Sequence, residues 1–361
     1  MVYIAKPMLG VEEKEAVFRV IDSGMIANGA VVGEFERKYA DYICVKHGIA
    51  TTSGTTALEV ALRALGIGDN DKVLTTPFSF IATANSIVYT GATPVFADID
   101  ADTYNIDPNK AEEALKTIKG IKAILIVHLF GRSCDADTFK ELAKKYNVFL
   151  VEDCAQSHGS TWNGAKTGSF GDVSSFSFYP TKNMTSGEGG MVLTDNDGVA
   201  GKSRLLINHG MAERYHHDII GYNYRMTNLA GAIGLCQLEK LESMNALRRK
   251  AAAVYDANIK NELITKPEPH EGHVYHQYTV RVKNGLRDAF LAHLAEKQIG
   301  YGVFYPLTMP EQKCYAGLGF ETRFPVSDMI KTQVVSLPVH PGLSDDEIRQ
   351  VTEAVNSFKG E

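Results

Sequence analysis

The sequence predicts an α/β protein with a mostly parallel sheet, helices on both faces of that sheet, and a smaller α+β domain after it. Helical and strand-like segments alternate through the first 240 residues, which is typical of strands joined by helical crossovers. Several strand-like runs are apolar without alternation, as expected for strands buried on both faces. We therefore expect a large domain over residues 1–240 and a small domain over residues 241–361.

The elements of the large domain follow from periodicity. Apolar residues at helical spacing predict helices over residues 11–22, 33–42 and 55–65, and Gly24 and Gly66 are stop signals. Short β-branched runs between helical segments predict strands over residues 72–76, 93–97, 123–127, 148–151, 173–177 and 191–194.

The pattern changes towards the carboxyl terminus. A long helix is expected from Asn228 to Tyr255. After Pro267 the sequence predicts strand, helix and strand over residues 278–282, 286–298 and 334–337. Ser344 and Glu347 have capping-box spacing and open a last helix.

The composition is that of a globular protein of about two domains. The chain has 361 residues, of which 44% are hydrophobic and 22% charged. The net charge of −6 argues against a protein that coats nucleic acid. No apolar run reaches the roughly 18 residues of a membrane span, so we expect no membrane insertion.

The five cysteines are scattered and form no Cys-x-x-Cys pair, and the first residues contain no apolar stretch typical of a signal peptide. Both features favour a reducing, cytoplasmic location. The sequence contains no dinucleotide fingerprint, no P-loop and no His-Glu-x-x-His motif, and the adjacent His216 and His217 are more typical of a solvated pair. We expect no metal site.

Three features in the large domain could form a site. The first is the segment Thr52–Ala57, just before an apolar helix. Gly54 permits close approach of a ligand, and Thr55 and Thr56 place hydroxyls where free N–H groups and the helix dipole favour an anion. The alternative is an ordinary helix N-cap.

The second feature is Asp153, which with Glu152 ends an apolar strand. Ligand sites of parallel sheets gather at the carboxyl ends of strands. A carboxylate that caps a following helix is the alternative, and it is favoured if this feature is taken alone.

The third feature is Lys182, which follows a strand and precedes a glycine-rich turn. Its neighbours are aromatic, small or hydroxylated, and no other lysine lies between Lys166 and Lys202. A loop lysine is usually a solvated charge, but this lysine has the surroundings of an amine held in a site.

Together the three features supply what pyridoxal 5'-phosphate needs: a lysine amine for the Schiff base, an anion cup, and a carboxylate opposite the pyridine nitrogen. A desolvated lysine near a cationic ring has a lowered pKa and can act as nucleophile and proton shuttle.

With these residues in place, the sequence resembles the DegT-type nucleotide-sugar aminotransferases, a branch of the fold-type I pyridoxal phosphate enzymes. The resemblance covers nearly the whole chain and is specific as an ordered set of motifs. These are Ser53–Leu58, Phe80–Asn85, Gly91–Phe96, Val127–Gly131, Glu152–Gln156, Phe176–Asn183, Gly187–Gly190 and Gly221–Thr227. It implies an aspartate-aminotransferase-like large domain.

The resemblance also implies roles. Lys182 would be the Schiff-base lysine and proton shuttle, Asp153 would pair with the pyridine nitrogen, and Gln156 would lie near the phenolic oxygen of the ring. Phe80 would stack on the ring, although it could instead be a core residue. The phosphate would be held by Gly54, Thr55, Ser177 and, across a homodimer interface, by Asn223; alternatively, Asn223 could satisfy a turn. Arg225 and Tyr305 would lie near the substrate.

The activity that the resemblance implies is ping-pong transfer of an amino group from an amino acid, L-glutamate above all, to the keto group of a nucleotide-linked sugar. Phe304 and Pro310 replace histidines common in relatives, which leaves the sugar and the aminated carbon open. Two alternatives are a pyridoxamine-dependent sugar dehydratase, whose relatives carry histidine in place of Lys182, and a non-catalytic regulatory protein of the same fold.

Overall fold

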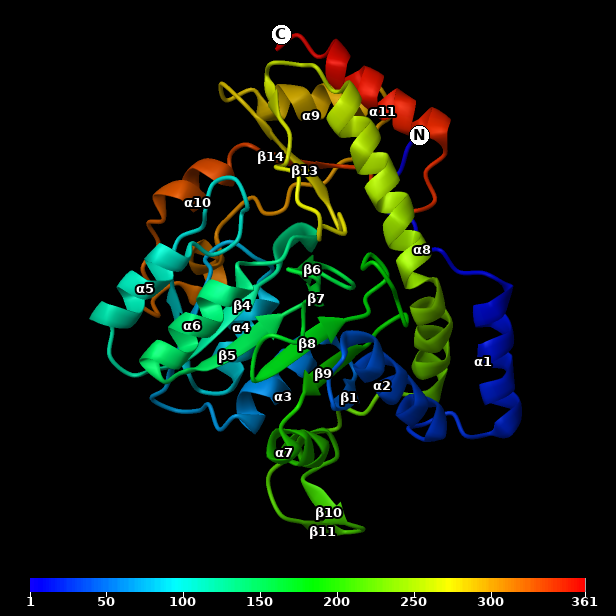
Figure 1. The fold of residues 1–361 in the computed structure, drawn as a ribbon, viewed down its shortest axis with the longest axis vertical. Helices are drawn as coiled ribbons and strands as arrows, with labels where there is room; N and C mark the ends of the chain where they lie inside the picture. Colours follow the sequence, from blue (N-terminus) through cyan, green and yellow to red (C-terminus); the bar gives the residue numbers. More distant parts are fainter. Residues whose placement is uncertain (361) are drawn as a thin grey trace.

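The computed structural model describes residues 1–360 and contains a central sheet of seven strands (Figure 1). Its strand order is β1-β9-β8-β5-β4-β2-β3. The parallel pairs are β2–β3, β2–β4, β4–β5 and β5–β8, whereas β9 runs antiparallel to both of its neighbours. The strands are β1 His47–Thr51, β2 Lys72–Thr75, β3 Thr93–Phe96, β4 Ile121–Val127, β5 Phe149–Asp153, β8 Val173–Ser177 and β9 Gly190–Thr194. The predicted α/β class and mostly parallel sheet are confirmed.

Helices cover both faces of this sheet. One face packs against α3, α4 and α7, and the other packs against α2, α5 and α6. Along β4, Ala123 and Leu125 face the first layer, whereas Ile124 and Ile126 face the second. Burial on both faces explains why this strand has no polar alternation. The helices of this part are α1 Val11–Ser23, α2 Ala30–Ile43, α3 Gly54–Ala64, α4 Ala82–Tyr89, α5 Pro108–Thr117, α6 Ala136–Tyr146 and α7 Asp197–Ile207.

A second core lies around an antiparallel sheet of order β12-β13-β14, packed by α9 and α11 (Figure 1). The remaining helices and strands are α8 Asn228–Asn258, α9 Arg287–Glu296, α10 Pro325–Ile330, α11 Asp345–Ser357, β12 Ile264–Thr265, β13 Tyr278–Val282 and β14 Val334–Leu337. Two small hairpins, β6 Thr161–Trp162 with β7 Ala165–Lys166 and β10 Met211–Glu213 with β11 His216–His217, lie outside both sheets.

The helix α8 runs across the expected boundary at residue 240 and joins the two cores (Figure 1). The amino-terminal Val2 is buried in the second core and pairs with Ile299. The division at residue 240 therefore remains a proposal, and the first residues of the chain pack with the smaller core.

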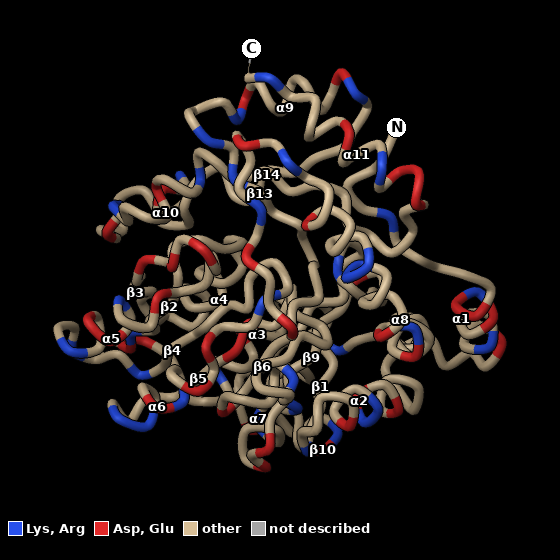
Figure 2. Tube along the Cα trace, turned by 45° about the horizontal axis from the view of Figure 1, so that its top comes forward, with Lys and Arg blue, Asp and Glu red and all other residues tan. Residues whose placement is uncertain are grey.

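Charged residues of both signs are intermixed on the outer helices α1, α5 and α6 (Figure 2). Within residues 1–360, no helix is both long and apolar enough to cross a membrane.

Candidate active site

A cavity of about 630 Å³ lies at the carboxyl ends of the parallel strands, where ligand sites of such sheets gather. Residues that follow β1, β2, β5 and β8 line the cavity, together with His276 and Gln277 just before β13 and with Phe304 and Tyr305. Eight of the ten predicted site residues lie on its wall: Gly54, Thr55, Phe80, Asp153, Gln156, Ser177, Lys182 and Tyr305. Its size is that of a site for a small molecule.

The first turn of α3 forms one end of this cavity. Ser53 caps the helix by accepting from the backbone N–H of Thr56, and the Thr56 hydroxyl is used within the same cap. A Cβ at Gly54 would lie 2.5 Å from the Cβ of Ser177, so only glycine brings this turn so close to the end of β8. The free N–H groups of the turn, with Thr55 and Ser177 beside them, suit an anion. This segment is therefore a helix N-cap, and the same residues also line the cavity.

Asp153 ends β5 and is 4% exposed. Its Oδ2 accepts from the Thr83 hydroxyl at 2.9 Å, and its Oδ1 accepts from the Ala155 N–H at 3.1 Å. Burial raises the pKa of Asp153, while these hydrogen bonds and the charge of Lys182 act in the opposite direction. The carboxylate does not cap a helix, because no helix follows β5 within residues 154–160.

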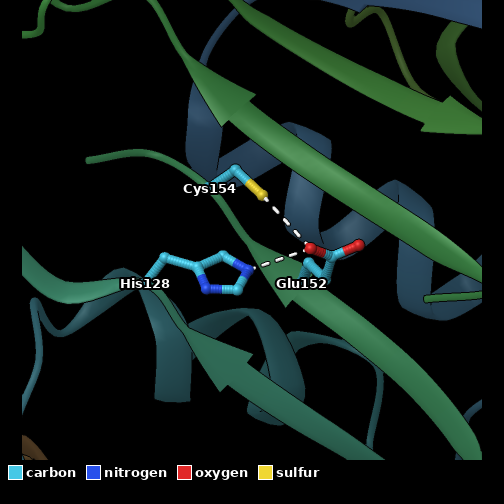
Figure 3. Close-up of side chains that lie close together, drawn as sticks. All are labelled: His128, Glu152 and Cys154. Carbon is cyan, nitrogen blue, oxygen red and sulfur yellow. Dashed lines mark hydrogen bonds and ion pairs between the residues drawn. The ribbon is translucent and has the colours of Figure 1, made fainter. Parts of the chain in front are cut away.

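The neighbouring Glu152 lies in a buried cluster with His128 and Cys154 (Figure 3). Its Oε1 accepts from the N–H groups of Phe170 and Gly171, and its Oε2 accepts from the Gly168 N–H and faces His128 Nε2 at 2.9 Å. The Cys134 N–H donates to His128 Nδ1, so the ring proton sits on Nε2 and points at Glu152.

Both oxygens of Glu152 thus have donors on the protein itself. Hydrogen bonds explain why these three side chains lie together. The bonds to Glu152 hold the end of β5, where Asp153 lies.

Lys182 lines the cavity from the loop after β8, and its backbone N–H donates to the Tyr179 carbonyl at 2.9 Å. Burial lowers the pKa of Lys182 to about 8, and the negative charge of Asp153 opposes this shift. The structure therefore contradicts the alternative of a solvated loop charge. At pH 7 about one in ten of these amines is unprotonated, far more than for an ordinary lysine.

Gln156, Tyr305 and Phe80 form a wall beside Asp153. The Gln156 side chain donates from Nε2 to the Tyr305 hydroxyl at 3.1 Å and accepts from the Phe130 N–H at 2.8 Å. Phe80 is 54% exposed, and its ring centroid is 6.3 Å from that of Tyr305. Its exposure shows that Phe80 is not a core residue, so its face is available to a planar ligand.

Asn223 and Arg225 do not reach this cavity within one chain. Asn223 is exposed and forms a β-bridge with Asn208. Arg225 donates to Asn208 Oδ1 at 2.6 Å and lines a different surface pocket of about 560 Å³ together with Arg204. Arg225 therefore does not lie near the cavity of its own chain, contrary to the expectation from the sequence.

Phe304 and Pro310, which replace histidines of the family pattern, lie in different surroundings. Phe304 lines the cavity, whereas Pro310 is buried in the short helix Met309–Glu311 and does not line it.

Sequence reasoning missed two residues of the site. Thr83 holds Asp153 and lies three residues after Phe80, in a segment that the resemblance already covered. His276 lines the cavity from the segment just before β13, and no sequence signal connected it with Lys182.

Comparisons with known proteins agree with this geometry. The model of the DegT/DnrJ/EryC1/StrS aminotransferase family matches residues 7–356. The chain is 40% identical to GDP-perosamine synthase of Caulobacter vibrioides, covering 98% of this chain and 97% of the relative. It is 41% identical to dTDP-3-amino-3,6-dideoxy-alpha-D-galactopyranose transaminase of Aneurinibacillus thermoaerophilus, covering 96% and 95%. Its fold matches that of S. venezuelae DesV in complex with a ketimine intermediate, with a TM-score of 0.91, 34% identity and coverage of 96% and 93%.

Proposed function

We propose that this chain, which belongs to the DegT/DnrJ/EryC1/StrS aminotransferase family, transfers an amino group from an amino acid to the keto group of a nucleotide-linked sugar. The observation that carries the proposal is one cavity with an amine of lowered pKa, Lys182, and a buried carboxylate, Asp153, on its wall. Relatives named for sugar aminotransferase products support the substrate class.

The residues present fit pyridoxal 5'-phosphate. When bound, this cofactor supplies a cationic ring that withdraws electrons from the carbon bearing the amino group. The buried carboxylate of Asp153 suits the ring nitrogen, and the first turn of α3 with Thr55 and Ser177 suits the phosphate. Gln156 and Phe80 would lie beside the phenolic oxygen and the ring face.

Lys182 and Asp153 have separate tasks in this proposal. With a pKa of about 8, the Lys182 amine can take up a proton at Nζ and return it without a large cost near neutral pH. Thr83 and the Ala155 N–H favour the ionised form of Asp153 against the effect of burial. In its ionised form this carboxylate would hold the ring nitrogen of the bound cofactor protonated.

We also propose that the active unit is a homodimer with shared sites. The exposed Asn223 would reach the partner's phosphate group, and Arg225 would lie near the partner's substrate. Exposed apolar side chains around α1 support an interface there, among them Phe18, Ile21, Met25 and Ile26. The five free cysteines support a reducing, cytoplasmic location.

The two alternatives are less well supported. By the resemblance, a sugar dehydratase would carry histidine at position 182, where this chain has a lysine on the cavity wall. A non-catalytic regulator would not need the amine, the carboxylate and the helix turn to share one cavity.

The proposal is tested by following the visible absorbance of the protein loaded with pyridoxal phosphate. We expect L-glutamate to remove the visible band, and a nucleotide-linked keto sugar from a panel with guanine, thymine and uracil nucleotides to restore it. Mass spectrometry should then show the sugar with an amino group in place of its keto oxygen. If no amino acid removes the band, or if the sugar loses water without gaining nitrogen, the proposal is wrong.

A further inference from the structure

Asn183, the residue after Lys182, is 1% exposed and has a fully determined side-chain orientation. Its Nδ2 donates to Asn245 Oδ1 at 2.8 Å and to the Val274 carbonyl at 3.2 Å. A carbonyl only accepts, so the amide nitrogen must be on this side. The Asn183 Oδ1 therefore faces His276 Nδ1, at 3.1 Å.

This orientation fixes the tautomer of His276. Because Asn183 Oδ1 only accepts, His276 Nδ1 must carry the proton and donate it. Nε2 is then an acceptor, and it has no hydrogen-bond partner within residues 1–360; His276 itself lines the cavity. Burial and the charges of Lys182 and Arg248 lower the pKa of His276 well below its usual value, which keeps the ring neutral.

The backbone at His276 is held as well. Arg248 on α8 is 5% exposed, and its Nη1 lies 3.3 Å from the Tyr275 carbonyl and 3.4 Å from the His276 carbonyl. Asn245, one turn earlier on α8, donates to the His158 carbonyl at 2.8 Å while accepting from Asn183. The segment that carries Lys182 is thus tied to α8 and to the residues before β13.

We propose that His276 is a positioning residue for Lys182: its Nδ1–H, by holding Asn183, keeps the Lys182 segment packed against α8 and the residues before β13, and the amine on the cavity wall. The inference rests on the proposed function only for the role of Lys182.

The physical consequence concerns the hydration of Lys182. Burial is the cause of its lowered pKa, so release of the Asn183 anchor should let water reach the amine and raise that pKa. The titratable residues that line the cavity with Lys182 are Asp153, Tyr179, Glu188, His276 and Tyr305. Lys6 and Arg248 line a smaller pocket that Lys182 also borders, and His158 is close enough for the charge of Lys182 to lower its pKa.

His276→Asn and His276→Gln distinguish the role of Nδ1 from that of Nε2. The amide nitrogen of an asparagine lies close to the place of Nδ1, and that of a glutamine lies close to the place of Nε2. His276→Asn therefore keeps a donor for Asn183, whereas His276→Gln and His276→Leu remove it. His293→Leu, on α9 of the same core, is the matched control.

The experiment measures the pH dependence of Lys182 acetylation by limiting acetic anhydride, read by peptide mass spectrometry on the full chain without cofactor. We expect a midpoint near pH 8 for the native protein and the control. His276→Asn should stay within about 0.3 pH unit of it, and His276→Leu and His276→Gln should move it up by about one unit or more. The last two should also lower kcat roughly tenfold or more, with little change in KM.

If His276→Asn is as strongly shifted as His276→Leu, or if none of the variants shifts the midpoint, the positioning role is wrong. ¹⁵N NMR of the histidines in the native protein gives a second test that needs no variant: a proton on Nδ1 of His276 supports the proposal, and a proton on Nε2 overturns it. The acetylation midpoint and the NMR measurement use neither a sugar nor an amino donor, so failure of the proposed function would affect only the kcat readout.

Discussion

Lys182→Ala is expected to lower the rate of amino transfer by about 10⁴-fold or more while leaving the fold intact. Lys182 is the one lysine whose amine lines the cavity with Asp153 within the described residues, and no neighbour offers a second amine at this place. Loss of a nucleophile and proton carrier together removes more than either role alone. Steady-state rates with the best donor and sugar, together with thermal unfolding, provide the measurement.

Lys202→Ala, on α7 and away from the cavity, is the control and should keep normal rates. The same Lys182 variant tests the shared site when it is mixed with Asn223→Ala. Random reassortment makes half of the dimers hybrid, with one intact site in each, so about a quarter of native activity should return. Normal rates for Lys182→Ala would mean that another residue does the chemistry, and absence of any return would contradict the cross-subunit role of Asn223.

Asp153→Asn is expected to lower kcat roughly 10- to 150-fold, the equivalent of about 1.5–3 kcal/mol for a charge-assisted hydrogen bond. The amide keeps the shape of the side chain but cannot hold a positive charge opposite it. Because the variant keeps the shape of the cavity wall, the affinity for the cofactor should fall by a smaller factor than kcat. Rates and cofactor titrations of the purified variant measure the two effects.

Thr83→Val is a milder change than Asp153→Asn, because it keeps the carboxylate and removes one of its hydrogen bonds. The Thr83 hydroxyl lowers the pKa of Asp153, so its loss raises that pKa and leaves more of the carboxyl neutral at low pH. The acid side of the pH–rate profile should therefore move to higher pH, and the rate at alkaline pH should be nearly restored. A profile that does not move, or an Asp153→Asn rate equal to the native one, would contradict the assigned role of the carboxylate.

The sequence predicted the central sheet well because its strands carry a strong signal. Residues 123–127 are apolar on both faces, as helix layers on both sides require. The strand His47–Thr51 was missed, since it is short, contains glycine and pairs with β9, which is far away in the sequence. The pairing of such an edge strand depends on tertiary structure rather than on local pattern.

The site residues that stand at or just after a predicted strand could be predicted from the sequence. Asp153 ends one strand and Lys182 follows another, so their convergence follows from the rule that ligands bind at the carboxyl ends of parallel strands. Phe80 was ambiguous, because exposure of an aromatic residue cannot be read from its type. His276 was out of reach, because its contact with Asn183 spans 93 positions of the chain. Asn223 and Arg225 do not line the cavity of their own chain, and only the proposed homodimer would bring them to a site.

The most direct test of the central claim is covalent capture of the cofactor at Lys182. The full-length protein, loaded with pyridoxal phosphate, is reduced with borohydride, digested and analysed by mass spectrometry. We expect the reduced cofactor on the peptide that contains Lys182 and on no other lysine. Attachment at another lysine, or recovery of an unmodified Lys182 peptide from a protein that transfers amino groups, would contradict it.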